Sequence, residues 1–279
     1  MRGEEYVPYV VTLLFAAALI LLVICRQRML RREDRPAVMI GNGQTIGRRP
    51  EQDDYFSSVS TDCGTLAVLA DGISGLAHGR MASTVAVSAF IREFIQLENG
   101  SDLPSYFTRA ARISNREILH RLRGGRGGTT LVAAVVQHSK LYWGAVGDST
   151  ISVFRNGQFI PMNSKHILEY ELEARYLAGE ITREAIASHP MRKRLVNYLG
   201  FDGFKNLDIS PEPFTLRKGD KVLLLSDGVY NALTELELEE ILTKRISPNE
   251  AAEEIIQAVE DKGYSDQDNA TVVILEQMR

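Results

Sequence analysis

Four aspartates mark the rims of the most apolar segments in this chain of 279 residues. Asp71, Asp148 and Asp227 each close such a segment, and Asp268 stands just before another. An aspartate beside glycine or asparagine is common in turns, so turn formation explains any one of them taken singly. Four carboxylates brought together at strand ends would repel one another unless a cation or protons separated them. Because hard oxygen ligands suit Mg²⁺ or Mn²⁺, the set favours a divalent metal centre.

The segments that must position these aspartates are short, rich in β-branched residues and bounded by turn residues, which predicts strands. They cover residues 65–71, 129–137, 140–148, 150–157, 220–227 and 269–276. Residues 37–47 predict either a first strand or a hairpin that turns at Asn42–Gly43.

Helices are predicted where apolar residues recur at helical spacing. They cover residues 79–96, 103–123, 234–243 and 248–261, and Asn249 or Ser247 could cap the last one. Strands in consecutive hairpins with helices inserted in pairs predict the α+β class, because a parallel sheet needs strict alternation of strand and helix.

Composition narrows the classes of function. The formal net charge is -4 and the acidic and basic residues are interspersed, which argues against a nucleic-acid partner. The chain has two cysteines, Cys25 and Cys63, so neither a disulfide framework nor a thiolate zinc site is predicted.

The N-terminus differs from the rest of the chain. Residues 7–25 contain no charged residue and are about as long as a membrane-spanning helix. Basic residues follow this stretch in residues 26–36, and Glu4 and Glu5 precede it, which by the positive-inside bias predicts a short extracytoplasmic N-terminus (1–6) and a basic juxtamembrane linker (26–36). A signal peptide would have the reverse polarity. The sequence thus predicts a single-pass cell-membrane protein that contacts lipid through residues 7–25 and has a cytoplasmic domain over residues 37–279.

A resemblance to a known family covers roughly residues 40–276. The motifs "GRRPEQDDYF", "LADGISG", "GGTTLVAA", "AVGDSTISVFRNG", "LLLSDGVY" and "SDQDNATVV" occur in this order. Together they resemble the metal-dependent Ser/Thr protein phosphatases, the PPM family or protein phosphatase type 2C. Residues 163–200 also look like the flap segment of bacterial members.

The resemblance implies a fold and a metal centre. The fold would be a sandwich of two antiparallel sheets flanked by helices, in α-β-β-α layers, with two Mn²⁺ or Mg²⁺ ions and a bridging water at its rim. Asp71 matches the carboxylate that bridges both ions, and the Gly72 carbonyl matches the backbone ligand beside it. Asp227 and Asp268 match the remaining ligands of one ion, and Asp53 matches the acidic residue near the other.

Further residues are assigned by the same resemblance. Asp148 matches the position of a weaker third metal, although an Asx turn is the alternative interpretation. Arg48 matches the arginine that holds the substrate phosphate, a task that suits a guanidinium fork. Arg49 is the adjacent alternative, since only the register favours Arg48. Asp54 is expected to be solvated surface.

The implied reaction is hydrolysis of phosphoserine or phosphothreonine in proteins by a metal-activated water. Phosphoprotein partners would include a membrane Ser/Thr kinase or its targets, since tethering raises the effective concentration of two membrane partners. An anti-sigma-factor antagonist is another substrate that the sequence leaves open. The alternative function is a catalytically inactive module of the same fold that binds or regulates a phosphoprotein. His78 and His166 are predicted at the surface and Trp143 in the core.

Overall fold

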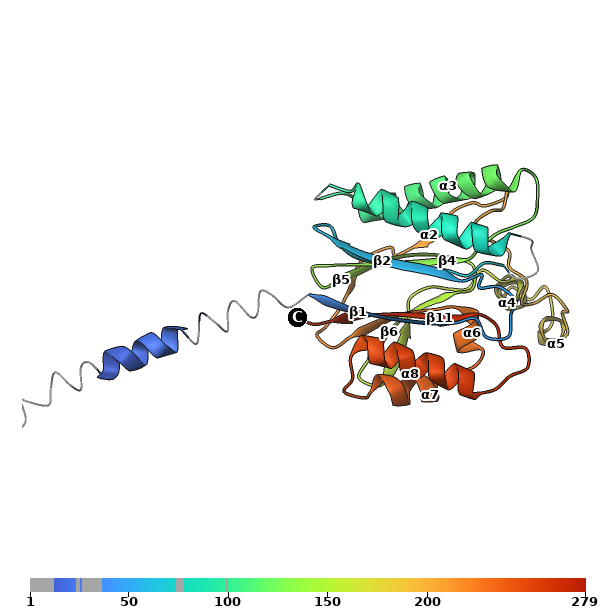
Figure 1. Ribbon diagram of the computed structural model, residues 1–279. Coiled ribbons are helices and arrows are strands. Elements are labelled where there is room, and N and C mark those ends of the chain that lie inside the picture. The colour runs from blue at the N-terminus through green and yellow to red at the C-terminus, as the bar shows by residue number, and fades with distance from the viewer. Residues whose placement is uncertain (1–12, 24–25, 27–36, 74–77, 99) are drawn as a thin grey trace, which may run out of the picture. The chain divides into compact units, whose positions relative to one another are not determined.

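The computed structural model describes residues 13–23, 26, 37–73, 78–98 and 100–279 (Figure 1). The chain divides into two units, Met1–Ala37 and Val38–Arg279, which are described separately.

In the first unit, residues 13–23 are helical. Within the part of the chain that the structure describes, every helix is too short or too polar to cross a membrane. The predictions of a transmembrane helix over 7–25 and of a cell-membrane location are therefore wrong. Residues 1–12, 24–25 and 27–36, which include most of the predicted extracytoplasmic and linker segments, lie outside the described residues.

The second unit contains two antiparallel sheets, one over the other (Figure 1). The first sheet has the strand order β1 (Val38–Thr45), β11 (Ala270–Gln277), β10 (Lys221–Leu225), β6 (Thr150–Arg155) and β7 (Gln158–Pro161). The second sheet has the order β2 (Tyr55–Thr61), β3 (Gly64–Ala70), β4 (Leu131–Gln137), β5 (Lys140–Val146) and β8 (Asp208–Ile209), with β9 (Phe214–Thr215) also paired to β5.

Helices cover the outer face of each sheet (Figure 1). The second sheet is covered by α2 (Gly79–Ile95) and α3 (Leu103–Leu122), and the first by α7 (Glu235–Leu242) and α8 (Pro248–Asp261). Three buried apolar clusters fill the spaces between these four layers, one under each helical layer and one between the sheets. The α+β sandwich with α-β-β-α layers is thus confirmed. Three shorter helices, α4 (Leu168–Leu177), α5 (Arg183–Ala187) and α6 (Asp227–Tyr230), lie toward one end of the sandwich.

Two glycines near the start of the unit decide how closely α8 packs. Strand β1 runs straight through Asn42–Gly43, so the alternative of a hairpin turn there is wrong. A Cβ at Gly41 would lie 2.0 Å from the carbonyl oxygen of Pro248, and one at Gly43 would lie 2.8 Å from that of Ala252. Glycine serves here to let a helix backbone approach the strand.

The start of α8 resolves the choice of its cap. The Ser247 hydroxyl accepts a hydrogen bond from the backbone N–H of Glu250, and the Glu250 carboxylate accepts one from the backbone N–H of Ser247. This reciprocal arrangement is a capping box, with Pro248 in the first turn. Ser247, not Asn249, is the cap.

Candidate active site

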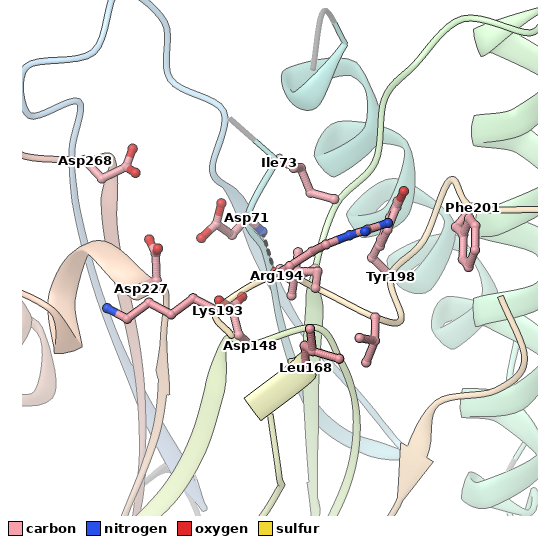
Figure 2. Close-up of a pocket in the computed structure, with 13 residues that line it drawn as sticks. Asp71, Ile73, Asp148, Leu168, Lys193, Arg194, Tyr198, Phe201, Asp227 and Asp268 are labelled. Carbon is pink, nitrogen blue, oxygen red and sulfur yellow. Dashed lines mark hydrogen bonds between the residues drawn. The ribbon is translucent and has the colours of Figure 1, made fainter. Parts of the chain in front are cut away.

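Aspartates from both sheets line one cavity of about 710 Å³ at the end of the sandwich. Asp71 comes from the second sheet, Asp227 and Asp268 come from the first, and Asp148 comes from the loop that joins the two (Figure 2). The structure therefore brings together all four aspartates that the sequence singles out at strand ends.

Asp71 lies at the centre of this arrangement because the backbone around it is fixed on both sides. It directly follows β3, the Asp71 N–H donates to Thr130 Oγ1 (3.1 Å), and the Asp71 carbonyl accepts from Thr130 N (2.8 Å) and Thr129 Oγ1 (2.8 Å). Burial raises the pKa of the Asp71 carboxyl well above its usual range, and the charges of Asp54, Asp227 and other carboxylates raise it further.

Asp227 is the first residue of α6, one residue beyond the cap Ser226 at the end of β10. The sequence predicted that Asp227 would end a strand, whereas it begins a short helix. Its carboxylate still reaches the cavity (Figure 2). Burial raises the pKa of Asp227 to about 7, and the charges of Asp148 and Asp268 contribute to the rise. Burial also raises the pKa of Asp148, while the nearby Lys165 ammonium opposes that rise.

Asp54 was expected to be solvated surface, and this prediction is wrong: the residue is 3% exposed. Its Oδ2 accepts hydrogen bonds from Ser226 Oγ (2.8 Å) and Thr271 Oγ1 (2.7 Å), whereas its Oδ1 is buried and has no hydrogen-bond partner among the described residues. Burial raises the pKa of Asp54 to about 6, against the lowering effect of those two hydroxyls. Since the Asp54 charge is the largest charge effect on the pKa of Asp71, the two carboxylates lie close together.

Neither Asp54 nor the neighbouring Asp53 is among the residues that line the cavity; Asp53 is also less buried than Asp54. Burial raises its pKa, and a backbone hydrogen bond from Arg80 opposes the rise. Its backbone N–H donates to Asn269 Oδ1 (2.8 Å). Asp53 therefore lies beside the cluster, near Asp268, whose charge also affects its pKa.

Asn269 holds the loop that carries Asp53 and Asp54 against β11. Its Nδ2 donates to the carbonyls of Ile46 (2.9 Å) and Glu51 (3.0 Å), in addition to the bond that its Oδ1 accepts from Asp53. Sequence reasoning missed this role because an asparagine between an aspartate and a strand has the pattern of an ordinary turn residue.

The two candidate arginines differ in position. Arg49 Nη2 lies 2.6 Å from Asp268 Oδ2, so this guanidinium is tied to a carboxylate of the cavity. Arg48 has an exposed side chain, and its backbone N–H donates to the Gln267 carbonyl (2.8 Å). Arg49 thus contacts a carboxylate that lines the cavity, whereas neither arginine is itself among the lining residues.

Gly72 lies where two backbone segments pack closely together. In the structure, a Cβ at this position would lie 2.5 Å from the Gly79 carbonyl carbon and 2.8 Å from the Asp53 carbonyl oxygen. The glycine therefore allows β3 to end against the start of α2.

The other wall of the cavity comes from the predicted flap, residues 163–200, and from Phe201. Lining residues from this part of the chain are Leu168, Lys193, Arg194, Leu195, Val196, Tyr198 and Phe201. Figure 2 shows Tyr198 and Phe201 on the side of the cavity away from Asp227 and Asp268. One wall is thus rich in carboxylates, while the other combines apolar and basic side chains.

Three residues outside the cavity lining test further predictions. His78 is exposed at the start of α2, and Trp143 is 9% exposed in the core, as predicted. The surface prediction for His166 is wrong, because its side chain is only 14% exposed. Its Nε2 lies 3.0 Å from Asp208 Oδ2, and its Nδ1 accepts from Gly147 N (3.3 Å).

The donor set at the cavity fits hard divalent cations. All of its charged donors are carboxylate oxygens, the pKa values of Asp54, Asp71 and Asp227 are raised by burial and by neighbouring carboxylates, and Asp54 Oδ1 is an unpartnered buried acceptor. In their present rotamers, no three Asp, Glu, His or Cys side chains in the described ranges come close enough to enclose an ion. The residues therefore fit divalent cations in the chemistry of their donor atoms, and because four of the aspartates line one cavity.

Comparison with known proteins decides the family. The family model for protein phosphatase 2C matches residues 40–262, which is most of the chain. The chain belongs to this family. The protein phosphatase 2C relatives include the serine/threonine phosphatase stp of Listeria innocua, which is 31% identical over 236 residues, covering 82% of this chain and 91% of the relative.

Solved structures of protein phosphatase 2C members agree with the fold. The serine/threonine phosphatase of S. agalactiae has a TM-score of 0.75 and 25% identity, covering 86% of this chain and 99% of that one. The catalytic domain of the serine/threonine protein phosphatase PstP, solved in complex with two manganese ions, has a TM-score of 0.68 and 25% identity, covering 87% and 99%. The chain is accordingly an enzyme of the protein-serine/threonine phosphatase class.

Proposed function

We propose that the cavity is a two-metal phosphatase centre that hydrolyses phosphoserine and phosphothreonine in proteins. The observation that carries this proposal is the convergence on one cavity of buried carboxylates from both sheets, with the pKa values of Asp71 and Asp227 raised by burial and by neighbouring carboxylates. Such a cluster of like charges is stable as a set of anions only when cations neutralise it. The manganese ions in the related PstP structure support the same choice of metal.

The proposed ligands differ in one respect from those that the sequence favours. Asp71, with the Gly72 carbonyl beside it, would be shared by Mn²⁺ or Mg²⁺ ions, and Asp227 and Asp268 would complete one site. Asp54 is buried, its Oδ1 is an unpartnered acceptor and its charge acts on Asp71, so Asp54 would take the place beside the other ion that the sequence gives to Asp53. When bound, the two ions would supply a water of lowered pKa and neutralise charge on the phosphoryl oxygens.

Arg49 would hold the substrate phosphate. A guanidinium can form paired charge-assisted hydrogen bonds to phosphate oxygens. Its side chain is 41% exposed and is held 2.6 Å from Asp268, at the entrance to the carboxylate cluster. Arg48, the first choice from sequence, forms no ion pair with a carboxylate among the described residues.

Asp148 would bind a weaker third cation. Its carboxylate lines the same cavity as Asp71 and Asp227, and burial raises its pKa. The Lys165 ammonium lowers that pKa and so already neutralises part of the charge, which would weaken the site.

The proposed substrates are phosphoproteins in general. A membrane kinase was preferred only because the sequence predicted a membrane anchor, and that preference is dropped with the anchor.

The decisive experiment is an assay of the full chain on phosphoserine and phosphothreonine peptides with Mn²⁺, with Mg²⁺ and with EDTA. Released phosphate is expected with either metal and none with EDTA. Asp71→Asn should lose both hydrolysis and calorimetrically measured Mn²⁺ binding, because Asp71 is the shared ligand. Wild-type protein that binds Mn²⁺ but hydrolyses no peptide would contradict the proposal in favour of an inactive phosphoprotein-binding module. Hydrolysis that persists in EDTA would contradict the metal assignment.

A further inference from the structure

Two basic side chains, Lys193 and Arg194, line the same cavity as the four aspartates. Both are exposed, and among the described residues neither forms an ion pair within 4.0 Å. Other arginines of this region are paired: Arg175 Nε lies 3.0 Å from Glu180 Oε2, and Arg192 Nε lies 3.8 Å from Glu169 Oε1. The positive charges on the cavity wall are therefore not neutralised by the protein.

The backbone that carries these two residues is fastened to the strand ends behind Asp71. Leu199 and Thr129 exchange two backbone hydrogen bonds (2.9 and 3.0 Å), and Thr129 Oγ1 donates to the Asp71 carbonyl. Further along, the Arg194 carbonyl accepts from Leu168 N (2.9 Å). The backbone on the C-terminal side of the two basic residues is thus hydrogen-bonded to the strand end beside Asp71.

The two side chains point to different parts of the cavity. Figure 2 shows Arg194 extending across the opening toward Tyr198, while Lys193 extends to the side on which Asp227 is drawn. Tyr198 stacks on Phe201 with ring centroids 5.2 Å apart, which gives the Arg194 side an aromatic wall. A volume of about 710 Å³ lies within the range of pockets that hold drug-sized ligands, so residues beside a phosphorylated side chain have room to enter.

Charge decides what these basic residues would bind. In the proposed function, divalent cations neutralise the aspartates, which leaves the Lys193 ammonium and the Arg194 guanidinium as positive charges on either side of the reacting phosphate. We infer that they bind anionic groups on the residues that flank the phosphorylated one, so that the preferred substrates carry acidic or additional phosphorylated side chains there. This inference rests on the proposed phosphatase function and names its substrate class.

The test compares three phosphoserine peptides of one length, in which the flanking residues are alanine, glutamate or a second phosphoserine. Full-length protein with Mn²⁺ should show a kcat/KM about three- to fivefold higher for glutamate than for alanine, because each exposed ion pair contributes roughly a twofold change. The doubly phosphorylated peptide should exceed both, since each phosphate carries more charge than a carboxylate. The preference should weaken at 1 M salt, where charges on an exposed wall are screened.

Variants assign the preference to the two residues. The double substitution Lys193→Gln/Arg194→Gln should reduce the ratio of kcat/KM between the glutamate and alanine peptides to about one. Lys193→Glu/Arg194→Glu should reverse the order in favour of the alanine peptide. Arg175→Gln is the matched control, because this arginine lies in the same segment but is paired with Glu180 and does not line the cavity. Its ratio should equal that of wild type.

Three results would overturn the inference: equal kcat/KM for all three peptides with wild type, a salt-independent preference, or a preference that survives the double substitution. If the double variant does not fold, the salt dependence of the wild-type ratio still decides. Absence of hydrolysis with every peptide would refute the phosphatase function instead. In that case the binding of the same peptides, followed by fluorescence anisotropy with Mn²⁺, tests the preference for anions by itself.

Discussion

Asp54→Asn should make the metal-free protein more stable at pH 8 while weakening its metal site. Asp54 is 3% exposed, and burial raises its pKa from 3.8 to about 6. A carboxyl whose pKa is higher in the folded state contributes its full stability only at a pH below its pKa in the unfolded state. That contribution is lost as the pH rises through its pKa in the folded state. At pH 8 the ionised carboxylate therefore destabilises the folded state by roughly 3 kcal/mol at most, taking 1.36 kcal/mol for each tenfold step.

The amide of asparagine removes this charge at little cost in hydrogen bonding. Its carbonyl oxygen can accept from Ser226 Oγ and Thr271 Oγ1 as Oδ2 does now, and its NH₂ group would take the place of the unpartnered Oδ1 beside Asp71. Urea unfolding in EDTA is expected to give a free energy up to about 3 kcal/mol higher than wild type at pH 8. The gain should shrink as the pH falls from 6 toward 4.

The matched measurement is Mn²⁺ binding by calorimetry, in which the variant should show weaker affinity at one of the two sites. A variant that is less stable than wild type by the same amount at pH 8 and at pH 4 would refute the cost of the buried charge. A variant that keeps full Mn²⁺ affinity and full activity would remove Asp54 from the metal centre and return that place to Asp53.

Two further substitutions test other parts of the site. Gly72→Ala would place a Cβ 2.5 Å from the Gly79 carbonyl carbon, so urea unfolding should show a loss of about 1–3 kcal/mol, and an unchanged midpoint would contradict the close packing. Arg49→Gln should lower kcat/KM on a phosphopeptide about tenfold or more, since hydrogen bonds to charged groups contribute about 1.5–3 kcal/mol. Arg48→Gln should change it less than twofold, and the reverse order would restore the assignment made from sequence.

Strands that are marked by a local run of apolar residues could be predicted from the sequence. Strands β3, β4 and β10 are compact runs of buried residues, as in β4, where six of the seven are buried, and such runs carry their signal locally. Strand β2 was missed because its sequence, YFSSVST, is half polar and none of its residues is buried. It is a strand because it pairs along its whole length with β3, and that pairing does not show in a local pattern.

The site shows the same division between local and long-range causes. Asp71 and Asp227 could be found because each ends a buried strand or follows it closely. The burial of Asp54 could not, because the hydroxyls of Ser226 and Thr271 that surround it lie 172 and 217 residues further along the chain. Their approach depends on β1, β10 and β11 lying side by side in one sheet.

The carboxylate cluster links the stability of the fold to its metal. In the absence of cations, burial and the charges of neighbouring carboxylates raise the pKa values of Asp54, Asp71 and Asp227, so each ionised carboxylate weakens the folded state at neutral pH. A cation that binds only the folded state stabilises it by about 2.7 kcal/mol at a hundred times its dissociation constant. This gain is of the same order as the cost of ionised Asp54. Before a cation binds, hydrogen bonds such as those of Asn269 and Thr129 hold the carboxylate-bearing loops together against this cost.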